Sequence, residues 1–317
     1  MRVGFIGLGN VGGKLARSLV RNGVDVAVHD LDADLVAGLM AEAPSRVGRV
    51  SGPPELMGTC DAVITCLPNP AASDAVMGEM LAEIGPGKLW MEMSTTDEAE
   101  VKRLGAMIIE RGGEAVDCPV SGGCHRAATG NISIFAGCAR PTFERVLPLL
   151  TVMGRRVLHT GPLGSASVLK VITNYLATAN LVSCAEALAV AKGAGMDLGT
   201  AYEAIRISSG TSFVHETESQ VILNGSRDIS FTMDLVAKDI GLFQDIADRA
   251  GVPVELNPEL IRIFEDGIAR FGPREFSPNV IKRLEEATGL DIRAPGFPAE
   301  MLDEEPEEAG SEVIVAR

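Results

Sequence analysis

The hydrophobic residues of this chain follow two different patterns. Over the first 160 residues, short apolar and β-branched runs alternate with stretches of helical period, which is typical of a doubly wound sheet of parallel strands. Most of the runs are continuously apolar, and this favours strands covered by helices on both faces. The predicted strands are residues 2–6, 25–29, 62–67, 89–93, 114–117, 132–136 and 156–159.

After Gly164 the strand patterns end, and helical periodicity continues from Ser165 to about Thr288. Residues that start helices recur there, at Asp197, Ser212, Asp234 and Asn257-Pro258. We therefore predict an α/β domain over residues 1–163, a connecting helix over 164–192 and an all-helical domain over 193–290. The remaining residues, 291–317, contain the acidic run DEEPEE and predict a flexible, solvated tail.

Composition narrows the class of protein. The chain has 317 residues, 46% of them hydrophobic, which is enough for two packed domains. Its formal net charge of −15 argues against nucleic acid or an anionic membrane as partner, because both require a basic face. No charge-free apolar stretch reaches the roughly 20 residues that span a bilayer, and no leader precedes the first strand. A cytoplasmic location is expected.

The cysteines and histidines indicate no metal site. The 6 cysteines form no C-x-x-C pair and lie in apolar or glycine-rich contexts, so we interpret them as reduced core thiols. The 4 histidines are far apart in sequence, and none lies at metal-ligand spacing from a cysteine or an acid.

A glycine-rich turn follows the first predicted strand. Gly7-Leu8-Gly9-Asn10-Val11-Gly12 has the G-x-G-x-x-G spacing and leads directly into a helix. Such glycines permit a tight turn, a close approach of backbone to a pyrophosphate and close helix packing, while the helix N-terminus offers amide donors to the phosphates. The turn predicts a dinucleotide site.

An acid follows at the distance that this site requires. Asp30 directly follows the second predicted strand, 18 residues beyond Gly12, where a carboxylate accepts hydrogen bonds from the adenosine ribose hydroxyls. A 2′-phosphate would meet this carboxylate instead of an arginine. We therefore predict NAD over NADP.

Three further loops follow predicted strands at the carboxyl edge of the sheet, where ligands bind in open α/β folds. Leu67 and Pro68 lie in one loop and Thr95 in the next, and both loops are suited to the nicotinamide ribose. In the third, Ser121-Gly122-Gly123 offers a hydroxyl and successive unhindered amides, which form an anion-binding nest for a carboxylate or else a simple tight turn.

Lys170 and Asn174 stand four residues apart in a run, 165–192, that is otherwise nearly all small or apolar. This spacing is about one helical turn, so both side chains project from one face of a helix. An ammonium on such a helix is costly unless it is paired, reaches solvent or serves chemistry. Lys170 is therefore a candidate working residue.

Four segments together resemble the β-hydroxyacid dehydrogenase family. They are GLGNVG, DCPVSGGCHRAATG, GPLGSASVLKVITN (161–174) and KDIGLFQD (238–245), they occur in the family's order, and the resemblance covers residues 1–290. It implies a Rossmann domain, a long interdomain helix and an all-helical second domain.

The resemblance also implies roles for the candidate residues. Lys170 would be the catalytic lysine, Ser121, Gly122 and Gly123 would hold the substrate, and Asn174 would orient its hydroxyl or carboxylate. Thr95 and Lys238 would lie on the nicotinamide side. Burial and the positive nicotinamide ring both disfavour an ammonium, and this lowers the pKa of a lysine toward the range useful for proton transfer.

The expected activity is NAD-dependent interconversion of a small anionic β-hydroxyacid and its semialdehyde or ketone, in a homodimer or homotetramer. Two alternatives stay open, an imine reductase of similar fold and a catalytically silent dinucleotide-binding scaffold. The loop after Gly123 departs from the family pattern with Cys124-His125-Arg126. His125 or Arg126 either pairs with a second anionic group of the substrate or belongs to a solvated loop surface.

Overall fold

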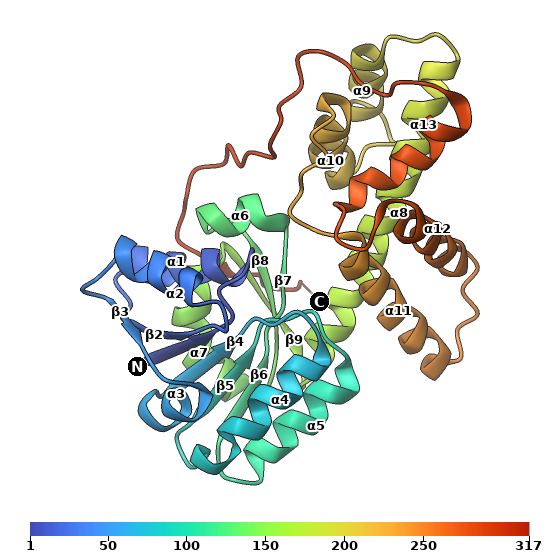
Figure 1. The fold of residues 1–317 in the computed structure, drawn as a ribbon. Helices are drawn as coiled ribbons and strands as arrows, with labels where there is room; N and C mark the ends of the chain where they lie inside the picture. The colour runs from blue at the N-terminus through green and yellow to red at the C-terminus, as the bar shows by residue number, and fades with distance from the viewer. Residues whose placement is uncertain (317) are drawn as a thin grey trace. The chain divides into compact units, whose positions relative to one another are not determined.

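The structure is a computed structural model that describes residues 1–316. The chain forms two compact units, shown together in Figure 1. The first, which we call the Rossmann unit, comprises Met1–Lys170 and the chain from Asp303 onward; the second, the helical unit, comprises Val171–Leu302. The division falls inside one long helix, between Lys170 and Val171.

The sheet of the Rossmann unit contains all seven predicted strands, with ends that differ from the prediction by at most two residues. They are β1 (Val3–Ile6), β2 (Val26–His29), β4 (Ala62–Thr65), β5 (Leu89–Glu92), β6 (Glu114–Asp117), β8 (Ser133–Gly137) and β9 (Arg156–Gly161). Three short strands were not predicted: β3 (Val47–Arg49), β7 (Val120–Ser121) and β10 (Ser311–Glu312). The order is β10-β9-β8-β6-β5-β4-β1-β2-β3, and β7 pairs with β8.

Helices cover both faces of this sheet, as the continuous apolar strands predict (Figure 1). Val3 and Phe5 of β1 belong to one core cluster with Leu15, whereas Ile6 belongs to a second cluster with Leu56 on the opposite face. The helices are α1 (Gly12–Arg21), α2 (Ala33–Glu42), α3 (Pro53–Thr59), α4 (Pro70–Met80), η1 (Leu81–Glu83), α5 (Glu98–Ile109), α6 (Gly123–Thr129) and α7 (Arg140–Met153).

The prediction of a purely parallel sheet was wrong at one place. β8 runs antiparallel to both β6 and β7, and β9 and β10 follow the direction of β8. The connection from β7 to β8 contains only the short helix α6, and a parallel crossover needs a longer connection that packs back across the sheet. The chain therefore turns back and pairs with the strands that it has just left.

The helical unit confirms the all-helical second domain. It contains α8 (Ser165–Gly193) from Val171 onward, α9 (Leu198–Arg206), α10 (Phe213–Asn224), α11 (Met233–Ala250), α12 (Leu256–Phe271), η2 (Ser277–Ile281) and α13 (Lys282–Thr288). Asp197 and Ser212 cap α9 and α10, each accepting a backbone N–H with its side chain.

Helix α8 is apolar for a structural reason. Among residues 1–316 it is the one helix long and apolar enough to cross a membrane, judged by length and composition alone. Leu181, Ala185 and Leu188 belong to the core of the helical unit. One side of the helix therefore packs in the core of that unit.

The C-terminal tail differs from the flexible, solvated arm that its composition predicts. From Asp303 onward it belongs to the Rossmann unit, and β10 adds a parallel strand beside β9. Its carboxylates pair with arginines that lie on α1, α6 and α7 and directly before β9. These arginines are far apart in sequence, so the tail's acidic composition gives no indication of its partners.

Candidate active site

The glycine-rich turn leaves open space where a dinucleotide approaches. Gly7 has φ +93°, and a Cβ there would lie 2.2 Å from the carbonyl oxygen of Cys66. A Cβ on Gly12 would lie 2.0 Å from the carbonyl oxygen of Gly7, so both positions require glycine. A Cβ on Gly9 would meet nothing within 4 Å. The turn is tightly packed on its inner side and unobstructed at Gly9, and this fits a pyrophosphate.

The Asp30 side chain is held against this turn. Its Oδ2 accepts the backbone N–H of Leu8 at 2.6 Å, and its Oδ1 accepts that of Asp32 at 2.8 Å. Each carboxylate oxygen retains a lone pair for a further donor. The half-buried side chain can therefore also accept hydrogen bonds from ribose hydroxyls.

The loops that follow β4 and β5 lie side by side. The backbone N–H of Leu67 donates to Oγ of Ser94 at 2.7 Å, next to Thr95, and Ser94 is itself buried. The structure thus brings Leu67 and Thr95 to one edge of the sheet. The sequence indicated that this loop is suited to the nicotinamide ribose, but it did not identify Ser94 as the residue that links the two loops.

The Ser-Gly-Gly segment forms the turn between β7 and α6. Ser121 is half-buried, and Gly122 and Gly123 have φ of +132° and +87°. L-residues with side chains rarely adopt this left-handed region, so the two glycines are required by the turn itself. Consecutive residues of this kind point successive amides toward one concavity, the arrangement of an anion-binding nest.

A buried acid that sequence reasoning missed ties this segment to α8. Asp117 ends β6, four residues before Ser121, and is fully buried. Its Oδ2 accepts the backbone N–H of Ser167 and its Oδ1 accepts the Ser167 hydroxyl, both at 2.7 Å. Lys170, 9% exposed, follows Ser167 by about one turn of the same helix.

Burial raises the pKa of Asp117 to about 6, while the hydrogen bonds from Ser167 act in the opposite direction. The nearby carboxylate of Glu92 adds to the rise. Asp117 and Ser167 both stand in segments that the sequence singles out. Their contact joins positions 50 residues apart, so no local pattern predicts it.

In the helical unit, a second buried carboxylate joins two candidate residues. Asp239, 1% exposed, accepts the side-chain amide of Asn174, and Nζ of Lys238 lies 2.9 Å from its other oxygen. Asn174 and Lys238 therefore share one partner, although they stand on α8 and α11. The candidate residues are divided between the units: Ser121, Gly122, Gly123 and Lys170 belong to the Rossmann unit, and Asn174 and Lys238 to the helical unit.

Arg126 does not belong to a solvated loop surface. Its side chain is 23% exposed and its Nη2 lies 2.8 Å from Oε1 of Glu305, a residue of the C-terminal tail. Burial lowers the pKa of the neighbouring His125. Arg126 thus contacts the tail directly, and the Asp303 carboxylate of the tail opposes the effect of burial on the pKa of His125.

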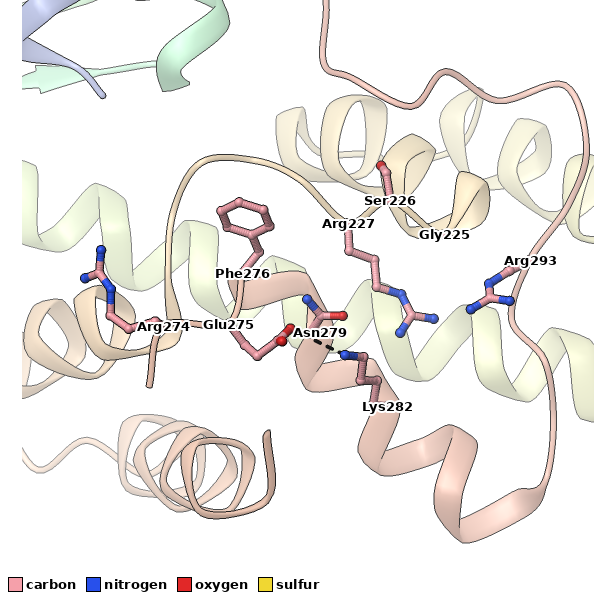
Figure 2. Close-up of a pocket in the computed structure, with 9 residues that line it drawn as sticks. All are labelled: Gly225, Ser226, Arg227, Arg274, Glu275, Phe276, Asn279, Lys282 and Arg293. Carbon is pink, nitrogen blue, oxygen red and sulfur yellow. Dashed lines mark hydrogen bonds and ion pairs between the residues drawn. The ribbon is translucent and has the colours of Figure 1, made fainter. Parts of the chain in front are cut away.

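The helical unit also contains a cavity of about 380 Å³ lined by basic side chains (Figure 2). Each of these cations has a carboxylate close by. The pairs are Arg227–Glu285 at 2.6 Å, Arg274–Asp234 at 3.2 Å, Lys282–Glu275 at 3.4 Å and Arg293–Asp291 at 3.6 Å. Because the positive charge is compensated within the chain, we interpret the cavity as part of an ionic network that joins the turn after α10 to α13.

A Rossmann unit with an open glycine-rich turn, followed by a helical unit, defines a class of two-domain nicotinamide-dependent dehydrogenases. Residues 2–161 match the family described as the NAD-binding domain of 6-phosphogluconate dehydrogenase. Residues 164–283 match the family described as NAD-binding of NADP-dependent 3-hydroxyisobutyrate dehydrogenase. The chain belongs to the β-hydroxyacid dehydrogenase family, and its cofactor is a nicotinamide dinucleotide.

Two relatives align over nearly the whole chain. The 2-(hydroxymethyl)glutarate dehydrogenase of Eubacterium barkeri is 32% identical over 296 residues, covering 92% of this chain and 97% of the relative. The NAD-dependent L-serine dehydrogenase of Pseudomonas aeruginosa is 33% identical, covering 90% of this chain and 98% of the relative.

Two solved structures have folds similar to that of this chain. The 3-hydroxyisobutyrate dehydrogenase of Mycobacterium tuberculosis, solved with L-serine, has a TM-score of 0.80 and 26% identity over 90% of this chain and 99% of its own. An imine reductase of Myxococcus stipitatus has a TM-score of 0.60 over 89% of this chain and 98% of its own. At 15% identity, this second likeness concerns the fold alone.

Proposed function

We propose that this protein interconverts a small β-hydroxyacid and its semialdehyde or ketone, with NAD as the preferred cofactor and Lys170 as the general acid and base. The observation that carries the proposal is the pair of hydrogen bonds from Ser167 to Asp117. They fix the first turn of the helix that bears Lys170 to the strand that leads into Ser121, Gly122 and Gly123. The proposed proton-transfer group and the proposed substrate loop thus share one buried anchor.

In this reaction the C–H and O–H bonds of the substrate's carbinol group break, and its carbon–oxygen bond becomes double. A bound, oxidised nicotinamide would accept the hydride that leaves the carbon. The neutral amine of Lys170 takes the hydroxyl proton, and in the reverse direction its ammonium returns a proton to the carbonyl oxygen. The low exposure of Lys170 excludes most bulk water from this transfer.

The remaining candidate residues would orient the substrate and the cofactor. The Ser121–Gly123 nest is suited to the substrate carboxylate because its amides and hydroxyl are donors. Asn174 would hold the reacting oxygen, and Asp239 supports this role because it fixes the orientation of the Asn174 amide. Lys238, paired with the same carboxylate, would lie on the nicotinamide side. No cluster of three potential metal ligands occurs among the described residues 1–316.

The preference for NAD rests on Asp30. Its carboxylate is held at the glycine-rich turn by the Leu8 and Asp32 amides. A 2′-phosphate at this position would meet like charge, whereas a ribose hydroxyl would find an acceptor.

We also infer a cytoplasmic homodimer or homotetramer. Leu176 and Val190, on the largely apolar helix α8, are 52% and 71% exposed, and apolar side chains at such positions favour contact with a second subunit. Light scattering after size exclusion tests the oligomeric state.

A panel of hydroxyacids tests the function. Purified protein is assayed with NAD and separately with NADP on 3-hydroxyisobutyrate, L-serine, 2-(hydroxymethyl)glutarate and a cyclic amine. We expect turnover of at least one hydroxyacid, with a higher kcat/KM for NAD. Oxidation of the cyclic amine alone would indicate an imine reductase, and NADH binding without any turnover would indicate a scaffold.

The Lys170 assignment is tested by Lys170→Ala, with Lys192→Ala on the same helix as the matched control. We expect the first variant to lose about a hundredfold or more in kcat, as is usual for a general acid or base, and to bind NADH nearly as the unmodified protein does. The control should retain full kcat. Comparable kcat in the two variants would reject Lys170 as the proton-transfer group.

A further inference from the structure

The C-terminal segment Asp303 to Glu312, which we call the acidic strap, lies outside both family matches, the second of which ends at residue 283. It nevertheless contacts the helix that follows the proposed substrate loop. Two of its carboxylates, those of Asp303 and Glu305, contact α6, whose first residue is Gly123 of the Ser-Gly-Gly segment.

The strap holds the end of α6 through Asp303. This carboxylate accepts the hydroxyl of Thr129, the last residue of α6, and the side-chain amide of Asn131 at 2.8 Å. Asn131 is only 3% exposed, and its amide also donates to the backbone carbonyl of Glu305 at 2.9 Å. The start of the strap is thereby fixed to the buried end of α6.

Glu305 ties α6 to the residue that precedes β9. Its Oε1 accepts Nη2 of Arg126 on α6 at 2.8 Å, and its Oε2 accepts Nη1 of Arg155 at 2.7 Å. Both arginine side chains are less than a quarter exposed, at 23% and 22%. These charge-assisted bonds have fixed geometry, since each guanidinium engages a separate oxygen of one carboxylate.

Helix α6 depends on such contacts for its position. It has seven residues, and helices of this length are not stable by themselves in water. Ala127 packs in the core of the Rossmann unit and holds one side of the helix. Arg126 and Thr129 carry the contacts to the strap, so the strap restrains the helix where the core does not.

We propose that Glu305 is a positioning residue for the substrate site. Acting through Arg126, it sets the position of α6 and thereby the backbone amides of Ser121, Gly122 and Gly123 that receive the substrate carboxylate. The proposal rests on the proposed function, since it requires this loop to bind the substrate.

Glu305→Gln tests the proposal, with Glu308→Gln as the matched control. Glu308 belongs to the same strap and pairs with the same Arg155 at 2.5 Å, but its ion pair involves no residue of α6. We expect Glu305→Gln to raise KM for the hydroxyacid about three- to tenfold, the effect of one weakened charge-assisted hydrogen bond. Its kcat, its KM for NAD and its melting temperature should stay close to those of Glu308→Gln. A general loss of structure would change both KM values, kcat and the melting temperature together.

Hydrogen exchange of peptides covering residues 121–130 provides a readout that does not depend on turnover. We expect faster exchange there in Glu305→Gln than in Glu308→Gln. Equal exchange and equal KM in the two variants would overturn the proposal, and so would faster exchange with unchanged KM. If the unmodified protein turns over no hydroxyacid, the proposed function is wrong. The proposed role of Glu305 in substrate affinity is then wrong as well. The exchange data then report separately whether Glu305 orders α6.

Discussion

Two ionic networks in this protein use the same residue types in different surroundings. In the helical unit, Arg227 is 2% exposed and pairs with Glu285, which is 18% exposed. In the Rossmann unit, Arg140 pairs with Glu312 of the acidic strap while itself 47% exposed. Desolvation makes the first pair costly to break, because Arg227 is buried and Glu285 has little access to water. In the second pair Glu312 is 17% exposed but the arginine is open to water, so water can solvate the arginine when the pair breaks.

Asp117 extends the comparison to a buried carboxylate that is held by Ser167, a neutral residue. Its donors are the hydroxyl and the backbone N–H of Ser167. Burial therefore raises its pKa, whereas the half-exposed Arg140 lowers the pKa of Glu312. The surroundings, and not the residue type, decide the direction of the shift.

The largest effect is expected for Arg227→Ala. Removing one partner of a buried ion pair should lower the free energy of unfolding by about 3 kcal/mol or more. Urea unfolding followed by far-UV circular dichroism measures it, because the chain's one tryptophan, Trp90, lies in the other unit.

Arg262→Ala is the matched control for this variant, since Arg262 and its partner Glu259 are 63% and 60% exposed in the same unit. It should unfold almost as the unmodified protein does. If the two variants lose similar amounts of stability, burial does not decide how much an ion pair of this unit contributes to stability.

An intermediate effect is expected for Asp117→Asn, and it should depend on pH. The pKa of Asp117 is about 6 in the folded chain against an ordinary value of 3.8, so the folded state binds the proton more tightly than the unfolded state. The stability that protonation contributes is present below pH 3.8 and is lost as the pH rises through about 6. Relative to Asp117→Asn, the unmodified protein should lose up to about 3 kcal/mol between these limits.

Urea unfolding at a series of pH values, followed by Trp90 fluorescence, checks this difference. The buried neighbours Glu92, Cys118 and Cys138 are present in both proteins and interact electrostatically with residue 117, so the comparison reports Asp117 together with this coupling. A stability difference that does not change with pH would show that Asp117 titrates normally.

The smallest effect is expected for Glu312→Gln. Losing a partly exposed pair should lower the melting temperature by no more than about 2 °C. The difference should vanish when NaCl is raised from about 0.1 M to about 1 M, because the screening length falls from about 10 Å to about 3 Å. A shift that persists at high salt would mean that β10 depends on this pair for more than charge.

The sequence predicted the parts of the fold that local patterns specify. The seven long strands are apolar because both faces are covered, and Asp197 and Ser212 start helices because their side chains accept backbone N–H groups. The glycine-rich turn was recognisable because its spacing follows from the geometry of a strand that leads into a helix. The direction of β8 was not recognisable from the sequence, because it depends on how the short connection through α6 turns the chain back in space.

The contacts that join distant positions could not be predicted from the sequence either, because they too depend on how the chain folds in space. Ser167 reaches Asp117, Asp239 links Asn174 to Lys238, and Glu305 bridges Arg126 to Arg155. Each contact depends on which side chains the packed chain brings within hydrogen-bonding distance. Linear spacing carries no such information.

By itself, the sequence determined the two-part architecture, the dinucleotide turn and the identity of the candidate residues, because periodicity and glycine spacing are local consequences of backbone geometry. Only the tertiary structure decided which acids are buried, which are paired and whether the acidic tail is free. These outcomes follow from desolvation and from partners supplied by remote segments, and both exist only once the chain has folded.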